Sequence, residues 1–173
     1  MTAVMARITL LVTLSVMLAG CNLRPLYSGG TSGVVAQQLG HVEIEPIAGK
    51  AGWLTRNALK DQLEAFEGKE AKYRLMIVLD DKIAGFGVRS DDRITRERRT
   101  LRARYQLVRL TDSVVVLDAT AGSDAGIDVV SSEYATLAAE DTALENLATR
   151  VSNQIVTRLS LFARTEASAS PEP

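Results

Sequence analysis

The sequence is poor in the side chains on which most catalytic and metal sites depend. Its 173 residues include one cysteine, one histidine and one tryptophan. A single cysteine can form no disulfide within the chain, so packing has to hold the fold. The lone histidine, His41, has no second histidine with which to share a metal ion, and it stands beside glutamates with no serine partner for a hydrolase triad. These shortages predict a protein with no catalytic residue, no metal site and no cofactor.

Net charge and long hydrophobic runs are also limited. The formal net charge is -1, so bulk charge predicts no nucleic-acid partner. The apolar run over residues 8–18 would rise only ~16 Å as a helix, too little to cross a bilayer core of ~30 Å. Hydrophobic residues make up 46% of the chain and charged residues 24%, which is typical of a globular domain. The length beyond this run suits one domain rather than two.

The first 21 residues follow the pattern of an exported bacterial lipoprotein. One basic residue and no acid precede the apolar run, which ends in the tetrapeptide Leu18-Ala19-Gly20-Cys21. Small residues allow an extended backbone to enter a peptidase cleft, and the cysteine offers a thiol for acylation. The tetrapeptide resembles a lipobox, the cleavage and lipidation site of bacterial lipoproteins. A short buried helix that happens to contain a cysteine is the alternative, and it does not account for these flanks.

The lipobox predicts cleavage between Gly20 and Cys21, which removes residues 1–20 as a signal peptide. Lipoproteins of this type carry a diacylglycerol on the cysteine thiol and a further acyl chain, such as palmitate, on its amine. The resemblance therefore implies a permanent membrane anchor at Cys21, because each buried methylene group contributes ~0.8 kcal/mol. The next residue is Asn22 and not aspartate. By the sorting rule of enteric bacteria, this implies the periplasmic face of the outer membrane.

The rest of the chain alternates between strand and helix patterns. Residues 21–40 are rich in glycine and serine, which predicts a flexible tether for the lipidated end. Residues 165–173 are small and polar with two prolines, which predicts a disordered tail. Between them, period-two and period-3.6 apolar patterns predict strands and helices. The expected strands cover 41–47, 73–83, 94–110 and 114–121, and the expected helices cover 53–66 and a long segment from Ser131 or Ser132 to about residue 164.

This order, β-α-β-β-β-α, predicts an α+β fold. The simplest packing is a two-layer α/β sandwich in which both helices lie on one face of a mostly antiparallel four-stranded sheet. We expect residues 41–164 to form it as a single domain.

Three short motifs resemble the LptE family of lipopolysaccharide-assembly lipoproteins, in its alphaproteobacterial form. They are the start Cys-Asn-Leu-Arg-Pro-Leu-Tyr at 21–27, the helix opening Ser-Glu-Tyr-Ala-Thr at 132–136, and Ala-Glu-Asp-Thr-Ala at 139–143. The expected element order matches the same family. The resemblance implies a non-enzymatic plug inside a large β-barrel of the LptD type, which delivers lipopolysaccharide to the outer membrane. Two other hypotheses are an auxiliary lipoprotein of another envelope lipid transporter and a tethered enzyme; the enzyme lacks convergent polar ligands.

Arginines cluster in the third expected strand. Seven lie between Arg93 and Arg109, with Glu97 as the one acid. Because strand side chains alternate, four of them share a face: Arg96, Arg98, Arg102 and Arg104. This face is the candidate contact for an anionic partner, either lipid A phosphates, which arginine binds bidentately, or the acidic lumen of the barrel. It could equally be a solvated face whose arginine stems cover apolar surface.

Overall fold

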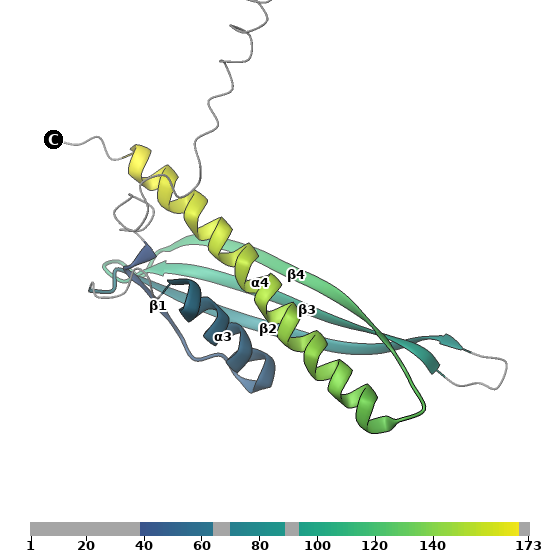
Figure 1. Ribbon diagram of the computed structural model, residues 1–173. Helices are drawn as coiled ribbons and strands as arrows, with labels where there is room; N and C mark the ends of the chain where they lie inside the picture. Colours follow the sequence, from purple (N-terminus) through teal and green to yellow (C-terminus); the bar gives the residue numbers. More distant parts are fainter. Residues whose placement is uncertain (1–38, 64–69, 89–93, 170–173) are drawn as a thin grey trace, which may run out of the picture.

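The structure is a computed structural model that describes residues 39–63, 70–88 and 94–169. For these residues, Figure 1 shows helices that pack against a sheet of long strands. The elements follow the predicted order: β1 (Val42–Ile44), α3 (Gly49–Leu63), β2 (Tyr73–Val88), β3 (Ile94–Arg109), β4 (Val115–Asp128) and α4 (Glu133–Ala169).

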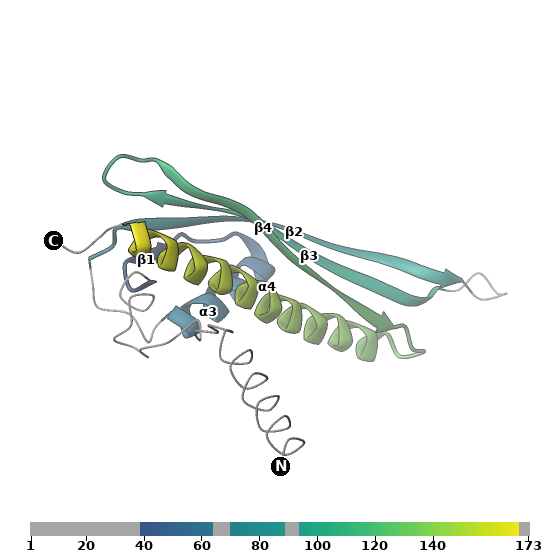
Figure 2. The same ribbon diagram turned by 90° about the horizontal axis from the view of Figure 1, so that it is seen from above.

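The sheet has the strand order β1-β2-β3-β4. β2, β3 and β4 form antiparallel pairs, whereas β1 pairs with β2 in parallel, because α3 carries the chain back across the sheet between them. Both helices lie on one face of the sheet (Figures 1 and 2). The predicted α+β two-layer sandwich is therefore confirmed, with one parallel pair in a mostly antiparallel sheet.

The core lies between this face and the two helices. Period two turns alternate residues of β3 inward, and these are almost fully buried: Leu101, Ala103, Tyr105 and Leu107. The matching stripe of α4 follows helical spacing and includes Leu144, Leu147, Val151, Ile155 and Leu159. At the contact between the helices, the Ser152 hydroxyl donates a buried hydrogen bond to the Thr55 carbonyl at 3.2 Å. Leu137, which the sequence pattern places on the same stripe, is 52% exposed.

Two strands are longer than predicted. β2 continues beyond residue 83 to Val88, and β4 continues beyond residue 121 to Asp128, although glycines suggested that both strands end earlier. At Gly122, an added Cβ would lie 2.4 Å from the Cδ atom of Arg102. The missing side chain thus leaves space for an arginine that crosses from β3, and the glycine belongs to the strand rather than to a turn.

Two predicted boundaries also move. Leu39, expected in the 21–40 tether, is 2% exposed and belongs to the core. α4 runs to Ala169, so the first part of the predicted 165–173 tail is helical. The signal peptide over 1–20, Gly20 and Cys21 lie outside the described residues. In the described ranges, no helix combines the length and the hydropathy needed to cross a bilayer.

Candidate functional site

The four predicted arginines lie together on the sheet face that the helices leave uncovered, here called the outer face. All four are exposed. Arg102 and Arg104 alternate with the buried core residues of β3, and Arg96 and Arg98 alternate with half-buried residues. The predicted orientation of the four side chains is therefore confirmed: Arg96, Arg98, Arg102 and Arg104.

Three of these arginines pair with aspartates that β4 places on the same face. Arg96 Nε donates to Asp128 Oδ1 at 2.9 Å, and the two residues are direct partners in the strand register. Arg102 Nη2 lies 3.1 Å from both carboxylate oxygens of Asp124. These contacts run across the β3–β4 boundary and form a ladder of opposite charges.

The third pair has the strongest geometry. The guanidinium of Arg104 donates to Asp118 through two nitrogens, with Nε 3.3 Å from Oδ1 and Nη2 3.0 Å from Oδ2. This is the bidentate arrangement that a planar guanidinium group favours. Gln106 Nε2 also donates to Asp118 at 2.8 Å. These hydrogen bonds, chiefly the one from Arg104, lower the pKa of Asp118, and those from Thr100 and then Arg102 lower the pKa of Asp124.

Arg98 differs from the other three. Its guanidinium carbon lies 5.2 Å from the centre of the Phe86 ring, a cation–π contact. Among the described residues, it makes no ion pair. Arg98 is thus the member of the four whose charge remains available to an anion.

The aspartates on this face are what the sequence analysis missed. Asp118, Asp124 and Asp128 stand an even number of positions apart, so period two places them on one face of a strand. The signal is present in the sequence, but a strand predicted to end at residue 121 leaves Asp124 and Asp128 outside it. The face expected to be basic is instead close to electrically balanced.

A further arginine of the cluster has a structural role on the helix side. Arg99 forms a two-nitrogen contact with Asp81, at 2.9 and 2.6 Å, and donates to the Glu140 carbonyl of α4 at 2.9 Å. Its side chain is only 11% exposed. Nearby, burial and then Glu140 raise the pKa of Glu97. These contacts fasten the far part of the β2–β3 hairpin to the first half of α4.

His41 has a local structural contact. Its Nδ1 atom lies 2.6 Å from the Glu70 carbonyl oxygen and donates to it. No group of three metal-ligating side chains occurs in the part of the chain that the structure describes.

The model of one protein family, LptE: lipopolysaccharide-assembly, matches residues 39–159. This stretch includes every strand and α3, and it makes up well over half of the chain. The chain belongs to the LptE family. The resemblance drawn from its short motifs is therefore confirmed.

Several solved structures share the fold of this LptE-family chain. A candidate lipoprotein from Caulobacter crescentus is 21% identical, with a TM-score of 0.61, over 78% of this chain and 98% of that one. Rare lipoprotein B from Shewanella oneidensis is 10% identical, with a TM-score of 0.57, over 74% and 97%. A minor lipoprotein from Acinetobacter baumannii is 10% identical, with a TM-score of 0.54, over 71% and 92%. At these identities the likeness shows the fold alone. No curated protein sequence matches this chain.

Proposed function

We propose that this LptE-family protein is a non-enzymatic, lipid-anchored plug of an outer-membrane β-barrel. Acyl chains on Cys21 hold it at the periplasmic face of the outer membrane. The sandwich fills the lumen of a barrel of the LptD type and assists it in delivering lipopolysaccharide to the surface. The observation that carries the proposal is the family match over residues 39–159, nearly the whole sandwich.

The charge ladder of the outer face suits such a plug. A charge that moves from water into an interface is costly unless it is paired and hydrogen-bonded. Arg96, Arg102 and Arg104 meet that condition before any partner arrives, because each is already bound to an aspartate of β4. Exposed apolar side chains of β2 lie on the same outer face, because they are register partners of outward-facing residues of β3. They include Met76, Val78 and Phe86. A face whose charges are paired except at Arg98, and which carries apolar side chains, can pack against a lumen wall with little uncompensated charge.

We propose that this face contacts the barrel, with Arg98 as the position that can also meet a lipid A phosphate. A charge swap at the Arg104–Asp118 pair tests whether the paired arginines serve contact with the barrel or binding of phosphate. In the double variant Arg104→Asp with Asp118→Arg, the pair is retained with its ends exchanged. If the paired face packs against the barrel, co-purification of the barrel in detergent falls far less in the swap than in either single variant. If the arginines instead bind phosphate, the swap loses lipopolysaccharide as completely as Arg104→Asp alone.

Two further measurements complete the test. Replacing Arg96, Arg98, Arg102 and Arg104 together by serine should reduce recovery of the barrel or of lipopolysaccharide, and unchanged recovery of both would remove the face from the proposal. Mass spectrometry of the native protein should find an acylated Cys21 as the first residue. Co-purification with an inner-membrane transporter in place of a barrel would contradict the plug function.

A further inference from the structure

The free edge of β4 carries a row of backbone groups that no other strand of the described sheet pairs. β4 is the last strand in the sheet order. In an antiparallel pair, alternate residues turn their N–H and C=O groups away from the partner strand. Val129 N–H donates to the Thr95 carbonyl at 2.9 Å, which shows that the odd-numbered residues face β3. The even-numbered residues from Thr120 to Gly126 therefore turn their backbone groups toward the open edge.

One side chain of α4 already binds this edge as a neighbouring strand would. Gln154 Oε1 accepts a hydrogen bond from the Gly122 N–H at 3.0 Å, and its Nε2 donates to the Gly122 carbonyl at 3.2 Å. The primary amide plays both roles of a peptide group toward a single residue of β4. A strand that displaced it would exchange two hydrogen bonds for two, so displacement costs little.

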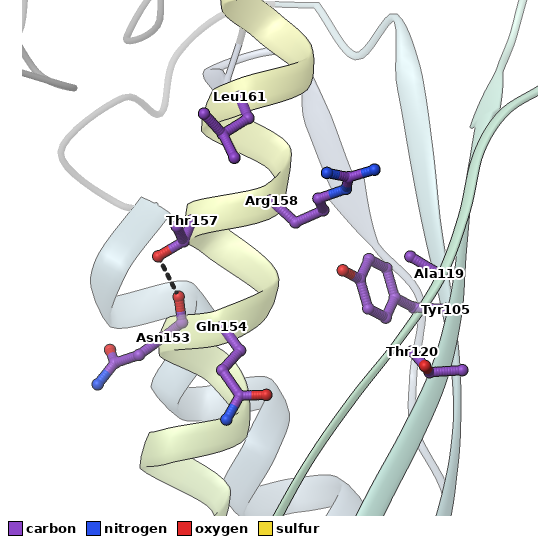
Figure 3. Close-up of a pocket in the computed structure, with 8 residues that line it drawn as sticks. All are labelled: Tyr105, Ala119, Thr120, Asn153, Gln154, Thr157, Arg158 and Leu161. Atoms are coloured by element: carbon purple, nitrogen blue, oxygen red, sulfur yellow. Dashed lines mark hydrogen bonds between the residues drawn. The ribbon is translucent and has the colours of Figure 1, made fainter.

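Two cavities lie along the edge, one on each side of Gln154. The larger, about 660 Å³, borders Thr120 and is lined on the helix side by Arg158. Figure 3 shows Gln154 and Arg158 extending from α4 on the side that faces the sheet. The smaller cavity, about 420 Å³, borders Gly126 and is lined by Arg150. The edge thus has room for side chains of an added segment on both sides of the glutamine.

The two arginines that line these cavities match the repeat of a strand. Arg150, Gln154 and Arg158 stand four residues apart on one stripe of α4, and eight residues of helix rise about 12 Å. In a strand, residues i and i+4 point to the same side and lie about 13 Å apart. Within the described residues, neither Arg150 nor Arg158 has an ion-pair partner. Two carboxylates at i and i+4 of an added strand would complement both.

We propose that the edge of β4 between Thr120 and Gly126 is a docking site for an extended, acidic segment of a partner protein. The segment adds as a fifth strand beside β4 and places two carboxylates, four residues apart, on Arg150 and Arg158. Backbone hydrogen bonds supply affinity, as in other strand-addition interfaces, and the arginines fix the register. This edge borders the outer face at Asp124, which pairs with Arg102, but the proposal stands independently of the plug function.

Amide hydrogen exchange of the full-length protein in detergent tests the proposal with a synthetic peptide. The probe alternates threonine with larger residues and carries glutamate at positions two and six, which share one face of a strand. At saturating peptide, exchange across residues 119–126 should slow at least about threefold, because amides at the edge become hydrogen-bonded. A control peptide carries the same glutamates at positions two and five, on opposite faces, and should protect the edge markedly less.

Protein variants provide the second half of the test. The double variant Arg150→Gln with Arg158→Gln should lose the preference for the first peptide, whereas Arg164→Gln, on the same helix but outside both cavities, should keep it. Gln154→Ala removes the competitor for Gly122 and should bind the first peptide at least as tightly as the unaltered protein. The proposal is overturned by unprotected β4 amides at saturating peptide, by equal protection from both peptides, or by an undiminished preference in the double variant. The assay contains neither barrel nor lipopolysaccharide, so its outcome is separate from that of the plug function.

Discussion

At the residue scale, Gly52 is the position where α3 has the least room. A Cβ atom there would lie 2.5 Å from the carbonyl oxygen of Ile47 and 2.7 Å from its carbonyl carbon. These are backbone atoms, so they cannot rotate away as a flexible side chain would. We therefore expect Gly52→Ala to shift α3 and to lower the free energy of unfolding by about 1–3 kcal/mol, the usual cost of overpacking.

Gly126 offers the matched control, because a Cβ atom there meets nothing within 4 Å. Gly126→Ala should leave stability within about 0.5 kcal/mol, or raise it slightly by restricting the unfolded chain. Urea denaturation of both variants measures the difference. Equal stability of Gly52→Ala and the unaltered protein would show that the Ile47 segment moves freely.

The contribution of the Arg104–Asp118 pair to the free energy of unfolding depends on pH, and the sign of this dependence follows from the shift in the pKa of Asp118. Arg104 first, and then Gln106, lower the pKa of Asp118 in the folded protein. The pair therefore contributes its full stability above the unfolded value of about 3.9, and the contribution is lost as the pH falls from there through the lower folded pKa. In Arg104→Gln, we expect the Asp118 midpoint to rise toward its ordinary value. Asp124, whose pKa is lowered by Thr100 and Arg102, should keep its midpoint in a carboxyl-carbon NMR titration.

At the scale of elements, alternation in β3 was enough to predict both its buried and its exposed face. For β4, the glycines after residue 121 predict the end of the strand, and this prediction is wrong because the strand runs to Asp128. Tertiary contacts explain the glycine at position 122. It leaves space for Arg102 on one side, and its backbone binds Gln154 at the edge. Arg102 and Gln154 are both distant from Gly122 in the sequence, so no local sequence pattern indicates these contacts. The ion pairs of the candidate site were missed for the same reason, since they depend on the β3–β4 register.

The last turns of α4 continue its packing beyond the stretch that the family model matches. Beyond residue 159, where the family match ends, the Phe162 ring packs edge-on against Tyr73 with centroids 6.0 Å apart, and Ala163 is 2% exposed. A chain that ends after Leu159 should therefore lose at least about 2 kcal/mol of stability, since buried aromatic and apolar contacts disappear.

A chain that ends after Arg164 is the control for this truncation. It keeps Phe162 and Ala163, and the side chains at 165–168 that it removes are exposed or half-buried, so its stability should stay within about 0.5 kcal/mol of the full chain. Thermal and urea unfolding of the two truncated chains would show whether the packing of Phe162 and Ala163 stabilises the fold. If both lost the same stability, the contribution would come from helix length rather than from packing on Tyr73.

At the scale of the whole molecule, each part of the fold depends on one shared core. The buried cluster draws residues from every described strand and helix, including Ile44 of β1, Leu59 of α3 and Ala121 of β4. Even Leu39, which precedes β1, is part of it. The sequence predicts a single domain with its core between helices and sheet, but it does not show that the core begins inside the expected tether, because the glycines and serines of residues 21–40 favour a flexible segment.

A shared core predicts that the chain unfolds as one unit without its barrel. We expect a Cys21→Ser chain that begins at residue 21, purified without a partner, to show a single cooperative transition. Trp53 on α3 is 63% exposed and reports on that helix by fluorescence, whereas far-ultraviolet circular dichroism is dominated by α4 and the sheet. The two melting curves should coincide, because Leu59 and Leu63 tie α3 to the same cluster as α4. Earlier loss of the Trp53 signal would instead mean that α3 detaches first and that the barrel has to hold it in place.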